Sequence, residues 1–151
     1  MDQDAFRKTY REINERACLF EKSILSGLCR CSKANRFCLA EREGVHCQHD
    51  NAQQQCAELI DLLREQARFA LKSNQQGEVL SHAKSMKIQV GGMRGLHALL
   101  SPETQPPRVI EDIHGLINQA IATFHSLPQI PLQPIIQQIA AYQGRRRRFG
   151  K

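Results

Sequence analysis

The chain opens with a long amphipathic pattern. Apolar residues recur at spacings of three and four between Asp4 and Leu25, which places them on one stripe of a helix. The residues on this stripe are Phe6, Tyr10, Ile13, Ala17, Phe20 and Ile24. The pattern predicts one helix from about residue 4 to about residue 25, with the stripe facing a core.

Two further helices are expected downstream. Ser32 can cap a helix over residues 33–43, and Gly44 stands where a helix often ends with a positive φ. Asp50 or Asn51 can cap a longer helix that runs to about Lys72. Its apolar face is the cleanest in the chain and consists of Ala52, Cys56, Leu59, Ile60, Leu63, Ala67 and Ala70.

The second half gives a weaker pattern at first. Residues 73–77 have the composition of a turn or linker. Apolar and polar residues alternate over residues 86–90, which predicts at most one short strand pair there. The bend expected after it contains three glycines, Gly91, Gly92 and Gly95. Helical spacing then predicts helices over about 109–124 and 132–143, joined by a proline-rich segment.

These elements predict an all-α fold. We expect an irregular bundle of five to six helices forming one domain over residues 1–143, with a Cys-rich segment (18–56) between the first and third helices. The chain carries a formal net charge of +6. Arg145, Arg146, Arg147, Arg148 and Lys151 supply five of these charges, so residues 144–151 form a basic tail on a nearly neutral body.

The cysteines are the densest chemical signal. All six lie within the first 56 residues, and a core normally uses cysteine singly. The four predicted metal ligands are Cys29, Cys31, Cys38 and Cys47. Cys56 lies on an apolar helix stripe, which favours core packing, and Cys18 fits either a core or a reserve ligand. Two histidines beside Cys47 are further alternative ligands, His46 and His49.

The compartment decides how these thiols cooperate. The charged N-terminus shows no secretory signal and no apolar run is long enough to span a membrane, so we expect a cytoplasmic protein with reduced thiols. The loose Cys-x-Cys, x6, Cys, x8, Cys spacing suits a 4Fe-4S cluster better than paired zinc knuckles. Zinc is the alternative cofactor, and free or disulfide-linked thiols are the remaining interpretation.

Basic residues surround the cysteines and end the chain. Arg30, Lys33, Arg36 and Arg42 could lower the pKa of nearby thiols or simply solvate a surface. The arginine run in the tail could contact nucleic acid or an anionic membrane surface, or act only as a solubilising end. The residues concerned are Arg145, Arg146, Arg147 and Arg148.

No enzyme signature is present, so a non-enzymatic role is expected. The leading hypothesis is a small iron-sulfur protein that acts as a redox accessory or sensor with a protein partner. The alternative is a zinc-stabilised interaction or nucleic-acid-binding module that uses the C-terminal arginines. A thiol redox switch without metal is a third hypothesis.

Overall fold

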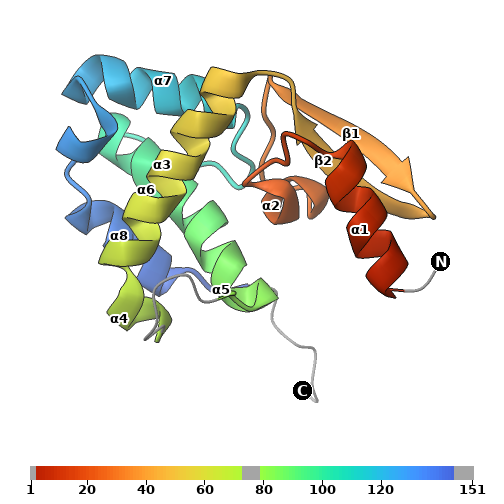
Figure 1. The fold of residues 1–151 in the computed structure, drawn as a ribbon. Helices are drawn as coiled ribbons and strands as arrows, with labels where there is room; N and C mark the ends of the chain where they lie inside the picture. Colours follow the sequence, from red (N-terminus) through yellow and green to blue (C-terminus); the bar gives the residue numbers. More distant parts are fainter. Residues whose placement is uncertain (1–2, 73–78, 145–151) are drawn as a thin grey trace.

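The computed structural model describes residues 3–72 and 79–144, and it is mainly helical (Figure 1). The elements are α1 (Gln3–Ile13), α2 (Glu21–Leu25), β1 (Ala34–Leu39), β2 (Arg42–Cys47), α3 (Asp50–Gln66), α4 (Arg68–Leu71), α5 (His82–Met86), the π-helix η1 (Lys87–Gly91), α6 (Gly92–Leu100), α7 (Ile113–Phe124), the 3-10 helix η2 (Leu127–Gln129) and α8 (Gln133–Ala141). Within the described residues, one short antiparallel sheet pairs β1 with β2. The fold is therefore mainly α rather than all-α.

The first predicted helix is broken in two. α1 ends at Ile13, and the buried Asn14 directs its side-chain amide to the carbonyl of Val45 (3.0 Å). An asparagine that bonds elsewhere in this way competes with helix continuation. The chain then passes through turns and a single bridge from Ala17 to His46 of β2 before α2 begins at Glu21. The apolar residues keep helical spacing on both sides of the break, so the periodicity of the sequence shows no sign that the helix is interrupted.

A β-hairpin replaces the helix predicted over residues 33–43. Its two-residue turn, Ala40 and Glu41, has φ values of 50° and 67°, the backbone of a type I′ turn. Val45 on β2 is fully buried, and Phe37 on β1 packs against Tyr10 of α1, with ring centroids 5.7 Å apart. The helix prediction was wrong because these tertiary contacts outweigh local propensity.

The strand pair and bend predicted near residues 86–95 were also wrong. Helices α5, η1 and α6 follow one another without a break from His82 to Leu100. Gly91 and Gly95 face α8 so closely that an added Cβ would lie 2.8 Å from the Cα of Ile139 or Ile135, respectively. These glycines therefore allow two helices to approach each other rather than form a turn.

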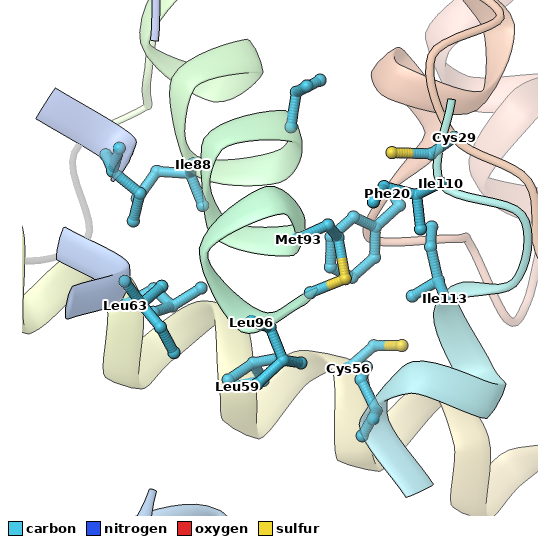
Figure 2. Close-up of a cluster of buried hydrophobic side chains, with 14 of the residues drawn as sticks. Phe20, Cys29, Cys56, Leu59, Leu63, Ile88, Met93, Leu96, Ile110 and Ile113 are labelled. Atoms are coloured by element: carbon cyan, nitrogen blue, oxygen red, sulfur yellow. The ribbon is translucent and has the colours of Figure 1, made fainter. Parts of the chain in front are cut away.

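The core lies where α3, α6, α7 and α8 meet, on the side of the molecule away from α1 and the hairpin (Figure 1). Figure 2 shows Leu59 and Leu63 of α3 facing Ile88, Met93 and Leu96. The predictions for α3, α7 and α8 are confirmed as helices, although α7 begins at Ile113 instead of residue 109. In the described part of the chain, no helix has the length and apolar character needed to cross a membrane.

Candidate functional site

Four cysteines from four different segments line one small pocket. They are Cys18, Cys31, Cys47 and Cys56. Cys18 precedes α2, Cys31 precedes β1, Cys47 ends β2 and Cys56 lies in α3. All four thiols are free, and the other lining residues are mostly apolar. We call this site the four-cysteine pocket.

Main-chain hydrogen bonds place three of these cysteines. The N–H of Cys18 donates to the carbonyl of Val45 (3.1 Å), and the N–H of Cys47 donates to the carbonyl of Arg16 (2.7 Å). The N–H of Gln48 donates to the carbonyl of Lys33 (2.8 Å), which fixes the segment after Cys31 against the end of β2. Main-chain hydrogen bonds thus join the three segments, and the Arg16 side chain adds a bond from its Nε to the carbonyl of Cys47 (3.1 Å).

Helix α3 brings the fourth cysteine. The His49 imidazole caps the helix by accepting from the N–H of Ala52 (3.4 Å), and Arg16 forms an ion pair with Asp50 (2.9 Å). The side chain of Gln53 donates to the carbonyl of Ala17 (3.0 Å), next to Cys18. Cys56 lies one turn after Ala52 on the same helix face, so these contacts aim its thiol at the pocket.

The C-terminal half closes the pocket. The N–H of Arg30 donates to the carbonyl of Ile110 (2.8 Å), and the N–H of Ser32 donates to the carboxylate of Asp112 (2.9 Å). Ile113 and His114, at the start of α7, line the pocket. The site therefore needs residues far from the cysteine-rich segment in sequence.

Backbone N–H groups point at two of the sulfurs. The N–H of Phe20 donates to the Cys18 sulfur (3.4 Å), and the backbone N–H groups of Lys33 and His114 lie where they oppose the burial-driven rise in the pKa of Cys31. Such bonds stabilise negative charge on sulfur. They are also among the contacts that tune iron-sulfur clusters.

The electrostatics of the pocket oppose free thiolates. Burial, together with the nearby thiols of Cys31 and Cys47, raises the pKa of Cys18 to about 12. Burial likewise raises the pKa of Cys31 and of Cys56. Every pair among the four cysteines is close enough for one thiolate to raise the pKa of the other. Four thiolates here would require a compensating cation.

The four basic residues near the cysteines in sequence do not outweigh the effect of burial on the pKa values of the thiols. Arg30 pairs with Glu111, and Arg36 pairs with Glu43 and donates to the carbonyl of Ile24. Arg42 stacks over the Phe6 ring, 4.7 Å from its centroid. Only Lys33 of the four lines the pocket, so burial dominates for its buried thiols.

Two of the four predicted ligands lie elsewhere. Cys29 is fully buried beside Ile110, apart from Cys56 in Figure 2, and burial raises its pKa to about 11. Cys38 is exposed on β1 opposite Glu43. The structure brings Cys31 and Cys47 together with two cysteines that the sequence had offered as possible alternative ligands, Cys18 and Cys56.

The two histidines considered as ligands have other partners. His46 shares a hydrogen bond with the Asn14 side chain (3.1 Å), and His49 caps α3. His114, which the sequence did not single out, lines the pocket, and its Nε2 lies 3.0 Å from the Asn118 amide nitrogen. The position of His114 depends on backbone hydrogen bonds between residues 28–30 and residues 110–113. No sequence pattern predicted this pairing.

The anion contacts predicted in the tail lie outside the described residues: Arg145, Arg146, Arg147 and Arg148.

The pocket is tight and its thiols are not gathered around a point. It has about 20 Å³ of free space, room for about one water molecule. Within residues 3–72 and 79–144, no group of three or more Cys, His, Asp or Glu side chains is arranged as it stands to hold a metal ion. Comparison with protein-family models, with curated proteins and with solved structures gave no match to this chain.

Proposed function

We propose that this chain is a small iron-sulfur protein whose 4Fe-4S cluster is bound by Cys18, Cys31, Cys47 and Cys56. One observation carries the proposal: four free thiols from four separate segments line a single apolar pocket. Random packing would scatter such residues. The ligand set differs from the sequence prediction by replacing Cys29 and Cys38 with Cys18 and Cys56.

The arrangement favours a cluster over a single zinc ion. Tetrahedral zinc with bonds of about 2.3 Å holds its four sulfurs about 3.8 Å apart. The described thiols are not gathered in this way. A four-iron cluster binds one thiolate at each iron and so keeps its ligands further apart, which matches thiols spread around a pocket wall. Because the cluster is larger than the free space, the loops that carry Cys18 and Cys31 would have to move outward.

The surroundings also suit a cluster. Iron would supply the positive charge that four buried thiolates need, and coordination would deprotonate the thiols despite their raised pKa values. The N–H groups directed at Cys18 and Cys31 would then donate to cluster ligands. The apolar walls would limit access of water, which affects the reduction potential.

The role we propose is redox accessory or sensor in the cytoplasm, acting with a protein partner. The cofactor would carry the chemistry, and the protein would set its potential and accessibility. The zinc-stabilised module is the competing function, and its tetrahedral site would require the pocket to contract instead of expand.

Anaerobic purification tests the proposal. We expect a brown protein with broad visible absorption and about four irons and four sulfides per chain, as four-thiolate cubane ligation requires. Iron and sulfide analysis beside zinc analysis checks this. A colourless protein with one zinc per chain would contradict the cluster and support the zinc-stabilised module. A protein with neither iron nor zinc would leave only the hypothesis of a thiol redox switch.

A further inference from the structure

A second cavity, unrelated to the four-cysteine pocket, is strongly basic. It is an open cleft of about 1060 Å³ between the end of α2, the α5–α6 helix and the segment after α8. Its lining includes Lys87, Arg94, Arg108 and apolar side chains such as Leu28 and Met86, and it has no acidic side chain. We call it the basic cleft.

The three cations of the basic cleft have no carboxylate partner in residues 3–72 and 79–144. Elsewhere Arg16, Arg30, Arg36 and Arg68 form ion pairs with carboxylates. Among the described residues, Lys87, Arg94 and Arg108 form none. Unpaired cations gathered in a concave site attract anions, because a cleft focuses their field.

Arg94 is held in place but keeps unused hydrogen-bonding capacity. One terminal nitrogen donates to the carbonyl of Arg108 (3.1 Å), and its guanidinium lies over the Tyr142 ring, 5.4 Å from the centroid. Its Nε is buried and has no partner among the described residues. A buried donor without a partner is costly, so this position favours an added acceptor.

The positive charges of the basic cleft are spread along it and are not gathered at one place. Lys87 and Arg94 are seven residues apart on continuous helix, about 10 Å along its axis. Arg108 also lines the cleft, and its carbonyl accepts a hydrogen bond from Arg94 (3.1 Å). A row of this length suits successive charges on a polymer better than one small anion.

We infer that the basic cleft binds the phosphate backbone of a single-stranded nucleic acid. The cations would contact successive phosphates, as in the positively charged grooves that follow a single-stranded backbone, and the apolar side chains that also line the cleft, such as Leu28 and Ala83, could contact bases. A single strand can enter a concave cleft, whereas a stiff duplex would contact only its rims. The inference is independent of the cluster, because none of the four cysteines lines this cleft.

The test is anisotropy of a fluorescent single-stranded oligonucleotide titrated with the full chain and with Lys87→Glu/Arg108→Glu. Both side chains are at least partly exposed and form no ion pair among the described residues, so the fold should survive, as circular dichroism and thermal melting would verify. We expect about tenfold or greater loss of affinity and a shallower salt dependence, as expected when phosphate contacts are removed.

The matched control is Arg7→Glu/Lys8→Glu on α1, which changes the net charge equally at exposed positions away from the cleft. It should change affinity by less than about threefold if contacts and not net charge decide binding. A chain ending at Gly144 should bind more weakly yet still respond to the cleft substitutions.

Several outcomes would overturn the inference. An equal loss of affinity in the cleft variant and the control variant would show that binding depends on net charge and not on the cleft. Binding that disappears with the tail and ignores the cleft substitutions would place the contact on the tail. A duplex of the same sequence that binds more tightly, or polyglutamate that competes equally at equal charge, would exclude a single-strand site.

Discussion

The cysteine-bearing region and the helical half are held together by different forces. Around residues 14–48, extended segments are joined by main-chain hydrogen bonds, such as those from Cys18 to Val45 and from Cys47 to Arg16. Between η1, α6 and α8, contact is by apolar side chains and by glycines that let backbones approach. The cysteine-bearing region positions the thiols, and the helical half contributes most of the close helix packing that supports them.

This difference predicts which substitutions should affect cofactor content and which should affect stability. Thiols on loops can be altered without removing much buried apolar area, whereas the helix contacts tolerate little added volume. Substitutions near the four-cysteine pocket should therefore change cofactor content first. Substitutions between α6 and α8 should change stability first.

The largest expected effect is on the cofactor. Replacing Cys18, Cys31, Cys47 or Cys56 singly with Ser should lower iron from about four per chain to less than one, because a cluster that lacks one of its four thiolate ligands is labile and is lost as a whole. Cys38→Ser is the matched control and should keep full iron, since Cys38 is exposed on β1. Iron loss in Cys38→Ser with retention in Cys18→Ser and Cys56→Ser would return the site to the sequence-derived ligands.

The second effect concerns pH in the metal-free protein. The folded pKa of Cys18 is about 12, and those of Cys31 and Cys56 are also raised by burial, above the unfolded values. The stability that these protonated thiols contribute is therefore complete below pH about 8.5 and is lost as pH rises toward the folded values.

Each thiol can lower the unfolding free energy by up to about 1.4 kcal/mol per pH unit in that window. Urea unfolding between neutral and alkaline pH measures the slope. Cys18→Ala should make the slope shallower, and the cluster-loaded protein should lack it because its thiols are already deprotonated. A metal-free protein equally stable across the window would contradict the burial of these thiols.

A third prediction addresses the helix contact. Gly95→Val should cost about 3 kcal/mol, because its Cβ would lie 2.8 Å from the Cα of Ile135 and force α6 away from α8. Gly144→Val is the comparison, since a Cβ there meets nothing within 4 Å. Denaturant melts measure both. A Gly95→Val protein as stable as the parent would show that the two helices are not in close contact.

The smallest effect is at the hairpin turn. Ala40→Asn with Glu41→Gly should stabilise the protein by about 1 kcal/mol, because both residues have positive φ, which ordinary side chains disfavour. Gln54→Gly in α3 should instead destabilise by about 1 kcal/mol, since it introduces glycine into a helix. A loss of stability in the turn variant would contradict the type I′ geometry.

The sequence predicted the helical half better than the cysteine region. The stripes of α3 and α7 correspond to real buried faces, because an amphipathic helix reveals its core side locally. The hairpin and the irregular 14–20 segment depend on partners distant in sequence. The glycines of α6 were read as a bend because their role, contact with α8, is invisible in local pattern.

The candidate site was half anticipated for a related reason. Density in sequence drew attention to Cys29 and Cys38, but on β1 the alternation of side chains leaves Cys38 exposed. Cys56 was assigned to the core because it shares a face with Leu59 and Leu63. That assignment is confirmed, because Cys56 belongs to the buried apolar cluster, and the same side chain also lines the pocket.

The pairing of residues 28–30 with residues 110–113 bears on how the chain can be divided. A fragment ending at Lys72 would contain every cysteine, yet it would lack the Ile110 carbonyl and the His114 N–H that complete the setting of Cys31. The cysteine-rich part is thus no autonomous module that could be transplanted alone. Two fragments, one ending at Lys72 and one starting at Val79, would form a split protein in which cofactor uptake reports reassociation.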